Sequence, residues 1–187
     1  MFLPPHFRKL KRGPQVILPK DIGVVIAYTG VGKDSVCVDA GTGSGWLAVS
    51  LARVCKEVTS YELRPEFIRI AEKNKEIAQI SNLTIRNADV TKKIFEKGVD
   101  LVTLDMLNAD KALKNAHKAL KPGGYVFGYL PHMEQVKAFV ARLESLKFGS
   151  ILTLEVIARD MLVRKEGVRP STKGVWHTGY LVFAQKE

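Results

Sequence analysis

Short apolar runs rich in β-branched residues alternate along the chain with longer segments whose apolar residues recur every three to four positions. The short runs are bounded by turn or cap residues and predict seven strands, at 36–39, 58–62, 83–87, 99–105, 124–130, 151–157 and 179–184. The longer segments predict helices at 46–54, 65–79, 108–121 and 132–146, with a further helix inside 17–30.

This alternation predicts an α/β fold in which a mostly parallel sheet carries helices on both faces. The runs at 151–157 and 179–184 are joined without a convincing helix, so the last of the seven strands is expected to be antiparallel. The 187 residues suit one compact domain with a sizeable core. We expect this single domain to occupy 15–187, after a flexible N-terminal lead-in at 1–14 that is rich in proline and cations.

The composition is basic, with 29 Lys and Arg against 19 Asp and Glu and a formal net charge of +10. This excess favours a polyanionic partner, nucleic acid ahead of a membrane surface, although a solvated lysine-rich surface gives the same composition. Cys37 and Cys55 form no disulfide framework and have no partner at zinc-ligand spacing, so no metal site is expected. The N-terminus lacks the apolar stretch of a signal peptide and no membrane span is evident, which predicts a cytoplasmic protein.

Two glycine-containing stretches are candidates for a ligand-binding loop. The first, GVGKDS at 30–35, has Ala27 where a phosphate-binding P-loop needs its first glycine and Asp34 where it needs Ser or Thr. It also precedes a strand, whereas a P-loop follows one, so we interpret it as a turn. The second, DAGTGSG at 39–45, lies between a predicted strand and a predicted helix, where glycines let a ligand approach the backbone.

Acidic residues around the second loop indicate the ligand. Asp39, directly before the glycines, would repel a pyrophosphate but can receive an ammonium group, directly or through water. Glu62, at the end of the next strand, can accept both hydroxyls of a ribose. A ligand with an amino acid at one end and an adenosine ribose at the other satisfies both carboxylates, which predicts S-adenosylmethionine. Asp89, after the third strand, can accept the adenine amine or cap a helix.

The ordered series DAGTGSG, YE, NAD, LVTLD and LKPGGYVFGYLP, over roughly 36–131, resembles the class I methyltransferases, whose fold is Rossmann-like. Two outer segments, GPQVILPKD at 13–21 and RPSTKGVWHTGYLVFA at 169–184, resemble those of the tRNA adenine-58 N1-methyltransferases. Members of that family use S-adenosylmethionine to methylate N1 of an adenine in tRNA, and they are typically homotetramers. The resemblance therefore implies a tRNA partner and a homo-oligomer, either a dimer or a tetramer.

The resemblance also implies roles for individual residues. It places Asp105 beside the methyl group and the target base as the catalytic residue, where it can accept a hydrogen bond from the N6 amine and stabilise the cation that forms. The target base would be flipped out of folded tRNA into a pocket, for which Gln15, His177 and Thr178 are the candidate substrate-binding residues. The implied cofactor-binding residues are Asp39, Gly41, Thr42, Gly43, Ser44, Gly45, Glu62, Asp89 and Asp105.

Three features depart from the family pattern. The chain reads DMLNAD at 105–110 where the family usually has Asp-x-Pro-x-Pro-Trp, and it has Leu18 where many members have Tyr. Only about a dozen residues precede Gly13, which we interpret as a missing N-terminal β domain. Two alternatives therefore stay open. One is a class I methyltransferase acting on a small molecule such as a corrinoid precursor, and the other is a non-catalytic RNA-binding subunit of a tRNA methyltransferase complex.

Overall fold

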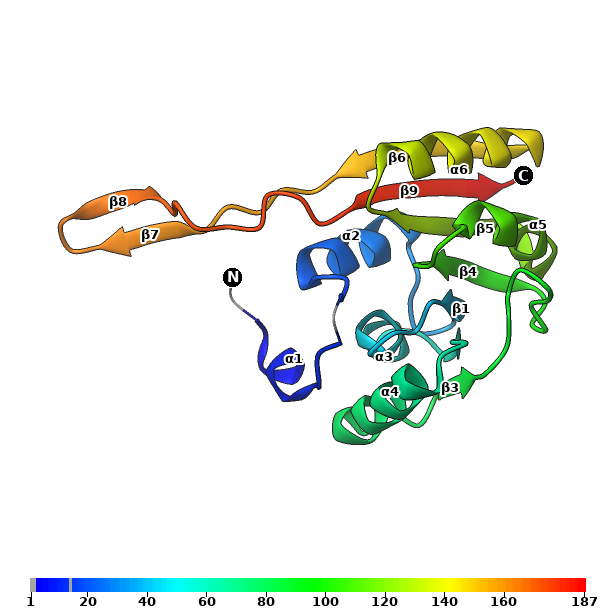
Figure 1. Ribbon diagram of the computed structural model, residues 1–187, viewed down its shortest axis with the longest axis horizontal. Coiled ribbons are helices and arrows are strands. Elements are labelled where there is room, and N and C mark those ends of the chain that lie inside the picture. Colours follow the sequence, from blue (N-terminus) through cyan, green and yellow to red (C-terminus); the bar gives the residue numbers. More distant parts are fainter. Residues whose placement is uncertain (1–2, 14) are drawn as a thin grey trace.

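The structure, a computed structural model, describes residues 3–13 and 15–187. Within these residues, seven strands form one sheet in the order β3-β2-β1-β4-β5-β9-β6 (Figure 1). Neighbouring strands are parallel from β3 to β5, whereas β9 is antiparallel to both β5 and β6, which confirms the predicted direction of the last strand. The strands are β1 (Val36–Ala40), β2 (Glu57–Tyr61), β3 (Leu83–Arg86), β4 (Val99–Leu104), β5 (Leu120–Leu130), β6 (Phe148–Glu155) and β9 (Tyr180–Lys186).

Helices cover both faces of the sheet, as the alternation of elements predicts (Figure 1). On β1, Cys37 packs into the core under α2 and α3, while the next residue, Val38, packs into the core under α5 and α6. The predicted Rossmann-like α/β architecture is therefore confirmed. The helices of the two layers are α2 (Pro19–Thr29), α3 (Trp46–Ala52) and α4 (Pro65–Ala78) on one face, and α5 (Ala109–Ala119) and α6 (Met133–Ser145) on the other.

The described part of the N-terminal lead-in packs against the first helical layer. It contains a short helix, α1 (Pro5–Lys9), whose Phe7 is buried with its ring 4.9 Å from that of Trp46. The backbone of Lys11 exchanges two hydrogen bonds with the Asn74 side chain, each 2.7 Å long. These contacts tie the lead-in to α3 and α4. No helix in the described part of the chain is long and apolar enough to cross a membrane.

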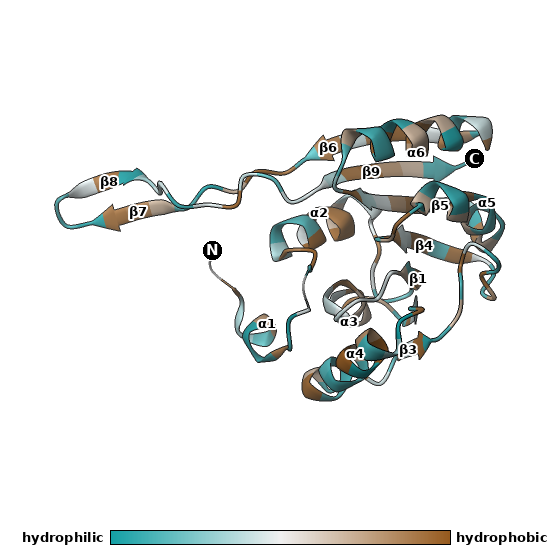
Figure 2. Cartoon of the chain, in the orientation of Figure 1, coloured by the Kyte–Doolittle hydropathy of each residue, from teal (hydrophilic) through white to brown (hydrophobic). Residues whose placement is uncertain are grey.

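A hairpin that the sequence analysis did not predict extends from the body of the molecule (Figure 1). It consists of β7 (Met161–Arg164) and β8 (Gly167–Pro170), which pair with each other as a separate antiparallel sheet. Figure 2 shows hydrophobic colouring along β7, and Val163 and Val168 are 75% and 64% exposed. Because these short strands have no buried face, they lack the regular alternation of apolar and polar residues that identifies a half-buried strand.

Candidate active site

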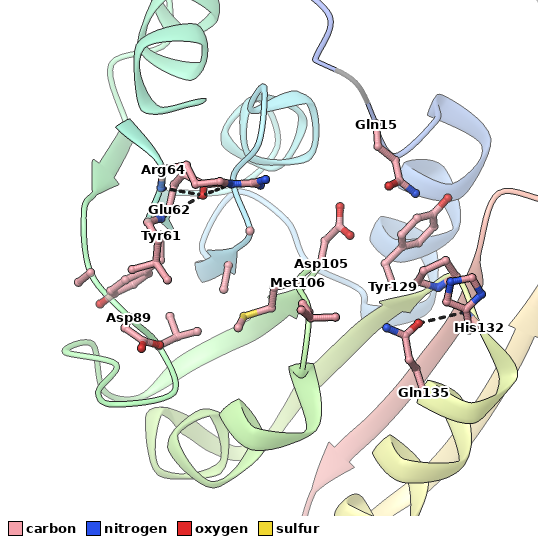
Figure 3. A pocket seen from close by; sticks show the side chains of 17 residues that line it. Gln15, Tyr61, Glu62, Arg64, Asp89, Asp105, Met106, Tyr129, His132 and Gln135 are labelled. Carbon is pink, nitrogen blue, oxygen red and sulfur yellow. Dashed lines mark hydrogen bonds and ion pairs between the residues drawn. The ribbon is translucent and has the colours of Figure 1, made fainter. Parts of the chain in front are cut away.

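The carboxyl ends of β1, β2, β4 and β5 meet at one edge of the sheet and enclose a cavity of about 500 Å³. We call this cavity of about 500 Å³ the main cavity. Open α/β sheets bind ligands at this edge. Figure 3 shows that Asp105 and Met106 lie between two groups of side chains, one with Glu62 and Asp89 and the other with Gln15, Tyr129, His132 and Gln135. The cavity therefore has two ends, and Asp105 stands at their junction.

The glycine loop after β1 brings two strands unusually close together. Gly41 has a φ of +87°, and a Cβ atom placed on it would lie 1.8 Å from the backbone oxygen of Asp105. The Asp105 N–H in turn donates to the Ala40 carbonyl over 2.8 Å. Only glycine fits at position 41, because any side chain would displace the backbone that presents Asp105.

Asp39 lies beneath this loop and is almost completely buried. Its two carboxylate oxygens accept hydrogen bonds from Ser60 Oγ, at 2.5 Å, and from Thr103 Oγ1, at 2.6 Å. Burial raises the pKa of Asp39 above its ordinary value. Asp39 lines a hollow of about 20 Å³ shared with the loop and with Asp105, and it does not line the main cavity. The predicted ammonium contact would therefore have to form in this hollow.

The hollow contains an unsatisfied polar atom. Ser44 Oγ is buried and has no hydrogen-bond partner among the described residues. Buried hydroxyls usually have a partner, so this atom is available to a ligand. Thr42, by contrast, is held within the protein, because its Oγ1 lies 2.6 Å from Ser60 Oγ.

Glu62 is anchored by backbone amides and lines the main cavity. One carboxylate oxygen accepts from the Gly43 N–H at 2.9 Å, and the other accepts from the N–H groups of Leu63 and Arg64 at 3.0 and 3.1 Å. These bonds fix the carboxylate at the rim of β2. Oε1 also accepts from Arg64 Nε at 3.3 Å and is therefore fully used, whereas Oε2, which accepts only the Gly43 N–H among the described residues, can still receive a ligand hydroxyl.

Asp89 closes a turn and caps no helix, because the residues that follow it up to β4 form only turns and loops; the alternative role as a helix cap is therefore wrong. One of its oxygens accepts from the N–H of Thr91 at 2.8 Å and from the Thr91 hydroxyl at 2.7 Å. The hydroxyl bond is the main reason that the pKa of Asp89 is lowered. Asp89 also lines the main cavity, beside Glu62. Its carboxylate thus closes a turn and faces the cavity at once.

Asp105 differs from the other acids because its carboxylate accepts no hydrogen bond from the described residues. Asp105 lines both the main cavity and the hollow, as Gly41 and Gln15 also do. Burial, followed by the negative charges of Asp39 and Glu62, raises the pKa of Asp105 to about 7. An unpaired acid with a strongly perturbed pKa in a cavity is a strong candidate for a functional group.

The three candidate substrate residues meet in one space. Gln15, His177 and Thr178 all line a cavity of about 320 Å³ next to the main cavity, which we call the side cavity, and Gln15 also lines the main cavity. Thr178 Oγ1 donates to the buried Asp21 at 3.0 Å and accepts from Lys20 Nζ at 2.9 Å. His177 contacts Glu155 at 2.6 Å and the Pro131 carbonyl at 3.0 Å, and the Glu155 bond raises the pKa of the imidazole.

Several cavity residues were not anticipated. Tyr129 near the end of β5, together with His132 and Gln135 at the start of α6, forms the end of the main cavity opposite Glu62 (Figure 3). The rule that sites form at the carboxyl ends of strands could have identified Tyr129. Leu107 lines the cavity at a position where the family pattern has proline, and Met106 lines it beside Leu107, so this wall is built from flexible apolar side chains.

The residues present fit S-adenosylmethionine. Anchored carboxylates stand where a ribose and an adenine amine can donate to them, and an unsatisfied hydroxyl lies in the hollow beside the glycine loop. In the described residues, no group of three or more His, Cys, Asp or Glu side chains is arranged to hold a metal ion.

The sequence matches the family model described as "tRNA methyltransferase complex GCD14 subunit" over residues 7–169. The chain belongs to this family. It is 36% identical to the tRNA (adenine(57)-N(1)/adenine(58)-N(1))-methyltransferase TrmI of Methanocaldococcus jannaschii, with 95% of this chain and 74% of the relative covered. It is 33% identical to the tRNA (adenine(58)-N(1))-methyltransferase TrmI of Thermus thermophilus, with 95% and 71% covered. The predicted family is therefore confirmed.

Solved structures agree with this assignment. The TrmI tRNA (m1A58) methyltransferase of Aquifex aeolicus superposes with a TM-score of 0.89 at 30% identity, over 95% of this chain and 72% of the other. A SAM-dependent O-methyltransferase of Thermotoga maritima superposes with a TM-score of 0.91 at 31% identity, over 97% of this chain and 69% of the other. A precorrin 8w decarboxylase of Methanobacterium thermoautotrophicum gives 0.81 at 19% identity, which shows a shared fold only. This chain is thus a class I methyltransferase of the tRNA adenine N1 type.

Proposed function

We propose that this protein transfers a methyl group from S-adenosylmethionine to N1 of an adenine in tRNA. The observation that carries the proposal is the place of Asp105, an unpaired carboxylate where the glycine-loop hollow meets the main cavity. A group at this junction can contact both the methyl donor and its acceptor. The family membership and the net charge of +10 favour RNA as the acceptor.

The cofactor end of the cavity is assigned from its donors and acceptors. Glu62 would accept a ribose hydroxyl and Asp89 the adenine amine, while Ser44 and the loop backbone would hold the amino-acid part of the ligand. S-adenosylmethionine, when bound, supplies an electrophilic methyl group. The protein's own task is then to align the lone pair of adenine N1 with that group.

The opposite end, with Gln15 and Tyr129, would hold the target adenine (Figure 3). Asp105 would accept a hydrogen bond from the N6 amine, which orients the base. Methylation at N1 makes the adenine ring cationic, and an adjacent carboxylate stabilises that charge more strongly than it stabilises the neutral base. Asp105 would thus act in binding and in catalysis.

We also propose that the protein acts as a homo-oligomer, either a dimer or a tetramer. The support is the projecting hairpin, whose Val163 and Val168 are largely exposed. Monomeric proteins rarely leave such apolar residues clustered in solvent. Light scattering coupled to size-exclusion chromatography tests this assignment, and a monomer at micromolar concentration would exclude it.

The central experiment incubates the protein with radiolabelled S-adenosylmethionine and unmodified tRNA, and then identifies the labelled nucleosides by mass spectrometry. N1-methyladenosine is the expected product, and mapping its position shows whether one adenine or two neighbouring adenines are modified. Absence of label in tRNA, with cofactor binding intact by calorimetry, would refute the proposal and favour a small-molecule acceptor. Absence of cofactor binding would favour a non-catalytic subunit.

A further inference from the structure

The side cavity is separate from the main cavity but shares two walls with it. Gln15 and Tyr129 line both spaces, and Figure 3 shows the Gln15 side chain directed toward Tyr129. The other walls come from segments that are distant in the sequence. Arg12, Val16 and Leu18 come from the stretch before α2, Trp46 from the start of α3, and Val175, His177 and Thr178 from the approach to β9.

The walls of the side cavity are held in place by contacts outside it. The indole N–H of the buried Trp46 donates to the Lys11 carbonyl at 3.1 Å, and the Phe7 ring packs against the indole. The hydroxyl of Thr178 is fixed between Lys20 and Asp21. A site whose side chains are already positioned loses little entropy when a ligand enters.

The chemistry of the side cavity suits a nucleobase. Val175 offers exposed apolar surface and Gln15 offers an exposed amide for hydrogen bonding, while Trp46 and Tyr129, which are 3% and 2% exposed, contribute only small areas to the lining. Arg12 adds a positive charge at an exposed position, where it can pair with a backbone phosphate. Apolar contact with the base, a hydrogen bond to its edge and a cation for its phosphate are means by which proteins hold single-stranded RNA.

Position identifies which nucleobase this is. If the target adenine occupies the main cavity beside Asp105, the next nucleotide of the strand must lie within one backbone repeat of it. The side cavity is the space on the other side of the Gln15–Tyr129 wall. We infer that the side cavity receives the nucleobase adjacent to the methylated adenine, an inference that rests on the proposed function.

The protein side of the test fills the side cavity. Val175→Trp places a large side chain on a lining position, while Val54→Trp, a partly exposed valine after α3 that lines none of the three cavities, is the matched control. Val175→Trp should raise the KM for tRNA about tenfold, the scale of one stacked base. The kcat and the affinity for S-adenosylmethionine should stay unchanged, and Val54→Trp should behave as wild type.

The RNA side of the test removes the base that the cavity would hold. An abasic nucleotide is placed on each side of the target adenine in turn, and kcat/KM is measured for wild type and Val175→Trp. With the wild-type protein, kcat/KM should be about tenfold lower for one of the two abasic RNAs than for intact RNA. With Val175→Trp, kcat/KM should be the same for that abasic RNA as for intact RNA. Equal losses in both proteins, or no loss in wild type, would overturn the inference. Failure of wild type to methylate intact tRNA would instead overturn the proposed function, and the inference with it.

Discussion

Asp105→Asn should make the cofactor-free protein more stable at alkaline pH while removing its activity. The carboxylate is only partly exposed, lies near two other acids and accepts no hydrogen bond from the described residues, so its ionised form is unfavourable in the folded state. The difference between a pKa of about 7 and the ordinary value of 3.8 corresponds to about 4 kcal/mol. Asparagine has nearly the same shape and no charge, so it removes this cost.

Proton linkage determines the direction in which the free energy of unfolding changes with pH. Because the pKa of Asp105 is raised on folding, the folded protein keeps a proton that the unfolded chain releases. Below about pH 4 Asp105 is protonated in both states and has no destabilising effect. As the pH rises from there to above about 7, the folded protein loses free energy of unfolding progressively, because the carboxyl must ionise in the folded state. The advantage of Asp105→Asn in free energy of unfolding should therefore grow from roughly 2 kcal/mol at pH 5 to about 4 kcal/mol at pH 8.

Urea unfolding of both proteins at pH 5 and pH 8, without cofactor, measures this difference. Asp34→Asn, at an exposed position in the turn before β1, is the control and should match wild type at both pH values. Methyl transfer by Asp105→Asn should fall by at least about 100-fold, with the affinity for S-adenosylmethionine largely retained. A variant less stable than wild type at pH 8 would show that the carboxylate has a structural role, and the reasoning would fail.

Three further outcomes are expected. Glu62→Ala should weaken S-adenosylmethionine binding by about 1–3 kcal/mol, measured by calorimetry, and unchanged affinity would remove Glu62 from the site. Gly41→Ala should lower the free energy of unfolding by about 1–3 kcal/mol and impair cofactor binding, because its Cβ would meet the Asp105 backbone, whereas Gly32→Ala, which has open space around it, should not. The KM for tRNA should rise steeply with salt while the affinity for S-adenosylmethionine changes little, and a flat salt profile would argue against an RNA substrate.

The sheet and the gathering of Glu62, Asp89 and Asp105 at one of its edges could be predicted from the sequence because both depend on local order. Buried parallel strands are short apolar runs, and parallel strands bring their carboxyl ends to one edge, so Glu62, Asp89 and Asp105 had to lie near one another. The partners of each acid could not be predicted in this way. That Asp39 is held by two hydroxyls, while Asp105 is left unpaired, depends on contacts between strands that sequence spacing does not specify.

The side cavity depends on long-range packing and was harder to predict. His177 and Thr178 lie close in sequence to β9, yet the cavity they line is closed by the segment before α2 and by Trp46. The hairpin of β7 and β8 was missed because it has no buried face. The periodic pattern of apolar and polar residues therefore identified the elements that build the core, but not the hairpin that projects from it.

The replacement of the family's prolines changes how the cavity wall is made. Leu107 lines the main cavity and is 76% exposed, so most of its apolar surface is in contact with water in the free protein. Covering such a side chain is favourable by about 25 cal/mol for each Å² removed from water. A base that enters beside Met106 and Leu107 would bury this surface, whereas a proline wall would already be rigid. We therefore expect substrate binding to order this wall, with part of the binding energy coming from that burial.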